Sequence, residues 1–194
     1  MGFGLPIELP PSHVDIATSR LIRRHATPFM ERAGKVVTFA ADEKPLLAGA
    51  VLYWLYGRAS PSSPRRLARA DHLLVCVAVS AALPHVLKLL VTRQRPDRKL
   101  MHGVPRHGIP YSGDPNASFP SGHAAHLGAI AAGLTRTASP SVAAIGWASA
   151  LALAGTRLLL LAHYLTDVLS GLAIGAAIEA MIAWITKRRS PPSA

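Results

Sequence analysis

The feature that most constrains this chain is a series of long apolar runs separated by short polar or basic links. These runs cover residues 73–91, 119–134, 141–162 and 168–185. A helix needs about 20 mainly apolar residues to cross a bilayer, and within lipid only helices and closed barrels satisfy every backbone polar group. The runs therefore predict an all-α, multi-pass membrane bundle of five or six helices, and a length of 194 residues predicts one domain.

The N-terminal region carries no run long enough to cross. Residues 1–11 are predicted to be an irregular tail, after which Ser12 can cap a helix with Asp15 near its positive end. Between residues 13 and 27 one helical face is apolar (Val14, Ala17, Leu21) and another is polar (Arg20, Arg23, Arg24, Thr27). This pattern predicts an interfacial helix on a membrane surface. A solvated helix packed on its own domain is the alternative.

The next segments are ambiguous. The stretch 29–41 contains Glu31, Arg32 and Lys35, which argues against a full crossing without partners. The run 46–56 covers only about 17 Å as a helix, so it is either the middle of a longer helix or a re-entrant piece. Residues 57–69 and 92–118 are rich in Ser, Pro, Gly or Arg and are predicted to be loops.

The charge distribution suggests an orientation. A net charge of +11 and a pI of about 10.9 fit nucleic-acid binding, but the basic residues sit between and beside apolar runs, as in loops that face anionic lipid. We therefore expect no nucleic-acid partner. Placing residues 65–69, Arg136 and 187–189 in the cytoplasm puts 92–118 and 163–167 on the opposite side. Five basic residues in that outer loop oppose this count: Arg93, Arg95, Arg98, Lys99 and Arg106.

A short turn opens the run that begins at residue 119, with the sequence Phe119-Pro120-Ser121-Gly122-His123. Proline suits a helix start, glycine lets the backbone approach a ligand, and histidine exchanges a proton near neutral pH. Free N–H groups at a helix start also bind phosphate. Alone, the pentapeptide fits equally a simple turn before a buried helix.

Two further clusters strengthen the functional interpretation. Lys88 is followed at a fixed spacing by Arg95-Pro96, and Thr156-Arg157 is followed by His163 and Asp167. Together with Pro120-Ser121-Gly122-His123, these residues resemble the three-part signature of the type 2 phosphatidic acid phosphatase family, the lipid phosphate phosphatases. The signature covers residues 88–167. Thr156 stands where the family usually has serine, and it keeps the hydroxyl.

The residues of the signature suit phosphoryl transfer. Arginine forks at Arg95 and Arg157 and a point charge at Lys88 can hold phosphate oxygens, although a lysine at the end of an apolar run can also be a snorkelling anchor. His163 and Asp167 share one helical face. Arg157 would point about 120° away from His163 on one continuous helix, so we expect a break between them.

The resemblance implies six helices and a particular mechanism. His163 attacks phosphorus to form a phosphohistidine, Asp167 holds His163, and His123 protonates the leaving oxygen and then activates water. The phosphate binds to Lys88, Arg95, Ser121, Gly122 and Arg157. No metal or other cofactor takes part. The implied protein is an integral membrane enzyme, of the inner membrane if bacterial, that acts on a lipid phosphate or diphosphate from the extracytoplasmic face.

Several alternatives remain open at this point. A vanadate-dependent haloperoxidase has a similar site, but those enzymes are soluble and much larger. A non-catalytic lipid-phosphate-binding or transporting membrane protein is the second alternative, which the presence of both His123 and His163 opposes. His85 and His126 are expected to be satisfied polar residues near the site, and His102 and His107 lie in the outer loop. The single cysteine, Cys76, is expected to pack in the bundle. The oligomeric state and the lipid itself stay undetermined.

Overall fold

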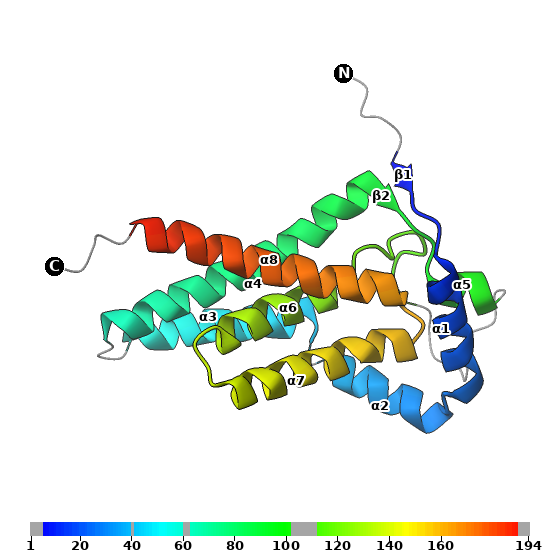
Figure 1. Cartoon of the computed structure of the whole chain (residues 1–194), viewed down its shortest axis with the longest axis horizontal. Coiled ribbons are helices and arrows are strands. Elements are labelled where there is room, and N and C mark those ends of the chain that lie inside the picture. The colour runs from blue at the N-terminus through cyan, green and yellow to red at the C-terminus, as the bar shows by residue number, and fades with distance from the viewer. Residues whose placement is uncertain (1–5, 40, 60–62, 102–111, 190–194) are drawn as a thin grey trace, which may run out of the picture.

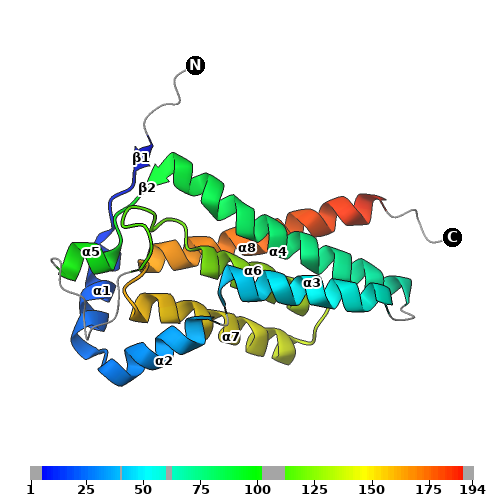
Figure 2. The same ribbon diagram turned by 180° about the vertical axis from the view of Figure 1, so that it is seen from behind.

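The computed structural model describes residues 6–39, 41–59, 63–101 and 112–189, which form eight helices and two very short strands (Figures 1 and 2). The elements in chain order are β1 (Ile7–Glu8), α1 (His13–His25), α2 (Pro28–Phe39), α3 (Glu43–Ala59), α4 (Pro64–Leu90), β2 (Val91–Thr92), α5 (Pro96–Met101), α6 (Gly122–Thr135), α7 (Pro140–Leu159) and α8 (Leu165–Arg189). The all-α prediction is confirmed.

Three helices, α4, α7 and α8, are long and apolar enough to cross a membrane. Large apolar side chains on their surfaces are exposed, among them Leu89 (77%) and Ile145 (67%). Such exposure is costly in water and natural in hydrocarbon, so these surfaces fit a lipid environment. With 17 and 14 residues, α3 and α6 are shorter, and both pack against α4 inside the bundle.

Close packing between α6 and α8 forms the centre of the bundle. A Cβ atom added at Gly128 would lie 2.2 Å from the carbonyl oxygen of Leu172, and one added at Gly175 would lie 2.0 Å from that of Ala125. Only glycine permits such an approach of the two backbones, as in other membrane helix pairs with small residues at the interface. This packing places the first turn of α6 beside the first turn of α8, where two parts of the predicted signature lie.

The two ends of the bundle differ. One end contains α1, α5, the paired strands and the α7–α8 turn, whereas the end of α3, the start of α4, the α6–α7 link and the C-terminal end of α8 lie at the other (Figures 1 and 2). The basic groups at residues 65–69, Arg136 and 187–189 are therefore separated from the signature clusters along the bundle, as the charge pattern predicts.

The N-terminal elements match the predictions in part. Ser12 and Asp15 form a complete capping box at the start of α1. The buried residues of α1 are Asp15 and Ser19, whereas Val14 and Leu21 are each 59% exposed. An exposed apolar face is what an interfacial helix presents to lipid. The irregular-tail prediction for residues 1–11 is wrong at β1, which pairs in parallel with β2.

Two loop predictions were too long. The loop at 57–69 is shorter because α3 continues to Ala59 and α4 starts at Pro64, a residue well suited to the first helical position. The run 46–56 is thus the middle of a longer helix. The loop at 92–118 contains the helix α5. The predicted break after Arg157 is confirmed, because α7 ends at Leu159 and α8 begins at Leu165.

Candidate active site

The structure brings the three parts of the signature together at one end of the bundle. Lys88 lies in the last turn of α4, Arg95 lies between β2 and α5, and Ser121 caps α6 ahead of Gly122 and His123. Arg157 lies in the last turn of α7, His163 in the following turn, and Asp167 in the first turn of α8.

Direct contacts join the three parts. The guanidinium Nη1 of Arg95 lies 3.2 Å from Nε2 of His163. The backbone N–H of Ser121 donates to the carbonyl oxygen of Asp167 over 3.2 Å. Both of these pairs are far apart in the chain, so the signature is assembled by the packing of α6, α8 and the segment between β2 and α5 around the α7–α8 turn.

His163 is buried and held in one tautomer. Its Nδ1 lies 2.6 Å from the carbonyl oxygen of Ser118. A carbonyl only accepts, so Nδ1 carries the proton and Nε2 keeps its lone pair facing Arg95. Burial lowers the pKa of His163 to about 3, against the opposing pull of Asp167. The imidazole is therefore neutral at physiological pH, and its unprotonated Nε2 accepts a hydrogen bond from Nη1 of Arg95.

Asp167 contacts His163 less directly than the sequence predicts. Its Oδ2 atom is 3.8 Å from Nδ1 of His163, beyond hydrogen-bonding distance. The same oxygen accepts from the backbone N–H of Tyr164 at 2.8 Å and from the hydroxyl of Ser118, while Oδ1 forms an ion pair with Arg93. The Ser118 carbonyl thus orients the imidazole, and Asp167 supplies a fixed negative charge beside it.

Arg95 is rigidly held by carbonyl oxygens. Its Nε donates to Asp114 (2.7 Å), Nη1 to Ala162 (2.7 Å) and Nη2 to Ala117 (3.0 Å). Burial lowers the pKa of Arg95 from its usual value, and the nearby carboxylates of Asp97, Asp167 and Asp114 oppose this. Its direct partners are neutral carbonyl oxygens rather than carboxylates, so an anion bound here would meet a preorganised cation.

Arg157 and Lys88 complete a cationic cluster. The buried Nε of Arg157 has no hydrogen-bond partner in the described part of the chain, and its Nη1 lies 3.5 Å from the hydroxyl of Thr38. Lys88 lies within electrostatic reach of both Arg95 and Arg157. Among the described residues no carboxylate forms an ion pair with any of the three. An unpaired buried cation is costly, and a bound phosphate would supply the missing charge.

His123 lies in the first turn of α6. Its Nε2 atom is 2.7 Å from Oδ1 of Asp42, without the alignment of a hydrogen bond. The hydroxyl of Ser121 accepts from the backbone N–H of Ala124 at 3.4 Å as the helix cap. A Cβ atom at Gly122 would meet only Pro84 at 3.9 Å, so packing among the described residues does not require glycine there.

Two further histidines, His85 and His126, and the cysteine have structural partners. His126 pairs with the hydroxyl of Ser80 at 3.0 Å, and His85 pairs with Glu43 at 3.0 Å, which confirms that both are satisfied. Cys76 is buried in an apolar cluster with Ile178 and Ile182, as predicted. His102 and His107 lie outside the described residues.

Five residues that contact the signature residues or their partners were not predicted from the sequence to belong to the site. They are Asp15, Asp42, Arg93, Ser118 and Thr166. For Arg93 a signal existed. It stands two residues before Arg95 in an extended segment, where β2 continues into an isolated bridge between Arg93 and Ala117. Residues two apart in a strand point to the same side, so Arg93 shares the direction of Arg95. No local pattern identifies Asp15 or Asp42.

The fold and the site together define a membrane protein that handles phosphoryl groups. Residues 70–191 match the model of the PAP2 superfamily, and since this is more than half of the chain, the protein belongs to that superfamily of membrane phosphatases. It is a multi-pass integral membrane protein.

Relatives of known sequence and structure agree with this assignment. The chain is 31% identical to a lipid A 1-phosphatase of Rhizobium johnstonii, over 82% of this chain and 69% of the relative, and 29% identical to that of Rhizobium etli, over 82% and 72%. Its fold resembles LpxE of Aquifex aeolicus (TM-score 0.71, 19% identity, 89% and 96% covered). It also resembles a phosphatidylglycerolphosphate phosphatase of Bacillus subtilis (TM-score 0.65, 19% identity, 92% and 87% covered).

Proposed function

We propose that this protein removes a phosphate from a phosphorylated glycolipid of the lipid A type, through a covalent phosphohistidine on His163. The observation that carries the proposal is the state of His163: a buried, neutral imidazole whose unprotonated Nε2 accepts a hydrogen bond from Nη1 of Arg95 at 3.2 Å, a bond that must be released for attack on phosphorus. A nucleophile beside a fixed cation is the arrangement that attack on a phosphate anion needs.

The reaction has two steps. In the first, the lone pair of His163 Nε2 forms a bond to phosphorus while the bond from phosphorus to the lipid oxygen breaks, and His123 gives that oxygen a proton. In the second, His123 takes a proton from water, whose oxygen attacks phosphorus and breaks the P–N bond. Inorganic phosphate leaves, and both imidazoles return to their starting state. The negative charge of Asp167 stabilises His163 while it carries the phosphoryl group.

The cations hold the phosphoryl oxygens throughout. Lys88, Arg95 and Arg157 supply the charge, and Ser121 with the N–H of Gly122 supplies neutral contacts at the start of α6. The carboxylate of Asp42 lies 2.7 Å from Nε2 of His123. A substrate phosphate bound beside this imidazole would be a second anion, and both anions favour the protonated imidazole that donates to the leaving oxygen.

The choice of a glycolipid substrate is supported by the curated relatives and by the surface next to the site. A hollow of about 320 Å³ is lined by Arg20, Arg23, Arg24 and Leu100. Arg23 donates to the carbonyl oxygen of Leu100 at 2.6 Å, which ties α1 to α5 just beyond Arg95. Positive charge at this place suits a lipid with a strongly anionic headgroup.

Phosphate release from a panel of lipids tests the proposal. Purified protein in mixed micelles is given lipid A, phosphatidylglycerophosphate, phosphatidic acid and a polyprenyl diphosphate at equal surface concentration. We expect the highest kcat/KM on lipid A. A higher value on one of the other lipids would refute the substrate assignment, and binding without hydrolysis of any lipid would show a non-catalytic lipid-binding protein.

We further propose that the active site faces the extracytoplasmic side. The signature lies at the end of the bundle opposite the basic residues at the start of α4, and positive residues favour the cytoplasm. Arg66→Cys and Arg98→Cys, each in a Cys76→Ala background, should react with an impermeant thiol reagent from opposite sides of the membrane. Labelling of both from one side would refute this orientation.

A further inference from the structure

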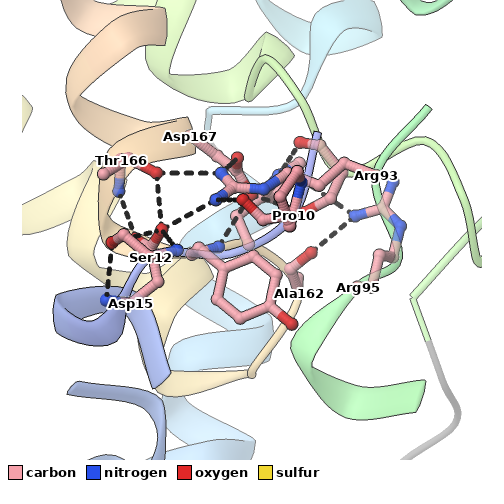
Figure 3. Close-up of polar contacts among 11 residues, drawn as sticks. Pro10, Ser12, Asp15, Arg93, Arg95, Ala162, Thr166 and Asp167 are labelled. Atoms are coloured by element: carbon pink, nitrogen blue, oxygen red, sulfur yellow. Dashed lines mark hydrogen bonds and ion pairs between the residues drawn. The ribbon is translucent and has the colours of Figure 1, made fainter. Parts of the chain in front are cut away.

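Among the buried charged groups that the mechanism above does not use, two lie beside the nucleophile, Arg93 and Asp15. Arg93 is 3% exposed, and Asp15 and Asp167 are each 0% exposed. Arg93 lies between the two carboxylates, as Figure 3 shows, with Nη2 2.7 Å from Oδ2 of Asp15 and Nη1 in an ion pair with Oδ1 of Asp167. One guanidinium thus joins the interfacial helix α1 to the carboxylate beside His163.

From this geometry we propose that Asp15 is a positioning residue, which acts through Arg93 to set the orientation and the charge of the Asp167–His163 pair. The inference rests on the proposed function of His163 as the nucleophile. It makes α1 part of the machinery that prepares the nucleophile, in addition to any contact between this helix and lipid.

The first argument is geometric. Asp15 accepts from the backbone N–H of Thr166 at 2.9 Å and from its hydroxyl at 2.9 Å, and that hydroxyl accepts from Nη1 of Arg93 at 2.8 Å. Thr166 precedes Asp167, so Asp15 anchors the first turn of α8 directly. The capping box of α1 holds Asp15 in turn, because the backbone N–H and the hydroxyl of Ser12 donate to it at 3.0 and 2.9 Å.

The second argument is that Arg93 reaches His163 by two routes. Its side chain holds Asp167, and its backbone carbonyl accepts from the N–H of Ser118 at 3.1 Å. The carbonyl of Ser118 is the direct partner of His163 Nδ1. The guanidinium also lies 4.8 Å from the ring centre of Tyr164, which stacks beneath it. A displaced Arg93 would therefore disturb both groups that face Nδ1.

The third argument concerns charge. Arg93 paired with Asp167 alone would cancel the negative charge that a phosphorylated imidazole needs nearby. With Asp15 as a second partner, the group of two carboxylates and one guanidinium keeps a net charge of −1 when all three are ionised. Burial alone would raise the pKa of Asp15, but the hydrogen bonds from Thr166 and Ser12 outweigh it and hold the pKa below its usual value. Asp15 is therefore ionised at physiological pH.

The test is Asp15→Asn, which keeps the shape of the side chain and removes the charge. We expect kcat on a lipid phosphate to fall on the order of 10-fold, as for other residues that support a catalytic group from behind, with KM within about twofold because the phosphate-binding cations are untouched. Asp15→Glu restores the charge and should recover part of the loss. The matched control is Ser19→Ala, which alters the other buried residue of α1 and should leave kcat within about twofold.

A double-mutant cycle shows whether Asp15 acts through Arg93. In an Arg93→Met background, Asp15→Asn should lower kcat clearly less than it does in the wild-type background, because the link through Arg93 is already broken and only the contacts with Thr166 remain to be lost. Independent, multiplicative losses would overturn the proposal, and so would full kcat in Asp15→Asn. If Asp15→Asn does not fold, Thr166→Val serves instead: it removes the hydroxyl shared by Arg93 and Asp15 and should lower kcat about threefold, whereas unchanged kcat would again overturn the proposal. An inactive wild-type protein would refute the proposed function itself. An active wild-type protein whose kcat is unchanged by Asp15→Asn would refute only the role of Asp15.

Discussion

The helix α8 carries two buried carboxylates in opposite surroundings. Asp167 lies in its first turn and Glu179 lies twelve residues later, about 18 Å along the helix. Glu179 accepts from His72 at 3.0 Å and pairs with Arg136 at 3.4 Å. Glu179 itself is thus the carboxylate partner of both basic residues, His72 and Arg136. Around Asp167, by contrast, Arg93 forms ion pairs with two carboxylates, whereas Lys88, Arg95 and Arg157 form none within the described part of the chain.

The difference teaches that a buried carboxylate in a membrane helix does not by itself mark a site. Both carboxylates are almost fully buried and both contact basic residues. What separates them is the charge left over once every pair is formed. An excess of fixed cations requires an anion, and at the Asp167 end that anion is the proposed phosphoryl group. At the Glu179 end the carboxylate is balanced by Arg136, so we interpret the contacts among His72, Glu179 and Arg136 as structural contacts that join α4, α6 and α8.

The largest effect is expected at the end with excess cations. His163→Ala removes the nitrogen that forms the covalent intermediate, and kcat should fall by roughly 10⁵–10⁶-fold, as for the loss of other catalytic nucleophiles. Lipid and aryl phosphates should be affected equally. Rapid alkaline quench, which preserves phosphohistidine, should trap labelled phosphate on the wild-type protein and none on the variant. A variant with residual turnover above about one per cent would contradict the nucleophile assignment.

The second prediction separates the two histidines. His123→Ala removes a proton donor, which is typically worth about 10²–10⁴-fold, and an aryl leaving group needs little of that help. The variant should therefore lose far more activity on an alkyl lipid phosphate than on an aryl phosphate. Initial rates on both substrates, with His163→Ala as the control, measure the ratio. Equal relative losses on the two substrates would show that His123 is not the general acid.

The third prediction tests the balanced end. Glu179→Gln leaves Arg136 without its counter-charge and weakens the hydrogen bond to His72, so it should lower stability by about 1–3 kcal/mol, a drop in Tm of about 2–4 °C per kcal/mol. Because the site lies at the other end of the bundle, kcat/KM per folded protein should stay within about twofold. Thermal unfolding in detergent and a phosphatase assay on one preparation measure both. A selective loss of kcat without a change in Tm would mean that this cluster takes part in function.

The smallest effect is expected from removing metal ions. The proposed clamp consists of Lys88, Arg95 and Arg157, and the described residues contain no group of three His, Cys, Asp or Glu side chains that could hold a metal ion. Activity should therefore stay within about twofold after dialysis against EDTA. Abolition of activity by EDTA with recovery on addition of Mg²⁺ would show that Lys88, Arg95 and Arg157 do not suffice to bind the phosphoryl group. It would refute the claim that the cations at the Asp167 end of α8 replace a metal ion.

Much of the fold and the residues of the signature could be predicted from the sequence, because the signals are local. The length of each apolar run is a property of consecutive residues, and a bilayer converts it into a helix. The break between Arg157 and His163 followed from the angle between residues on one helix, and α7 indeed ends at Leu159. The capping box at Ser12 is likewise a four-residue pattern. Helix boundaries at 57–69 and 92–118 were less accurate, since Pro and Arg occur in first turns as readily as in loops.

The contacts that Arg93 and Asp15 make with the first turn of α8 were decided by tertiary structure alone. Arg93 pairs with residues 74 and 78 positions away, and Asp15 meets Thr166 across 151 positions. No periodicity or spacing relates such residues. They meet because glycines at the α6–α8 contact bring those backbones together and because β1 pairs with β2, which carries α1 over the turn before α8. Sequence by itself therefore determined the membrane helices and the candidate catalytic groups. Packing alone decided that the Ser118 carbonyl, rather than Asp167, contacts Nδ1 of His163. Packing also decided that Arg93 pairs with Asp167 and that Asp15 pairs with Arg93.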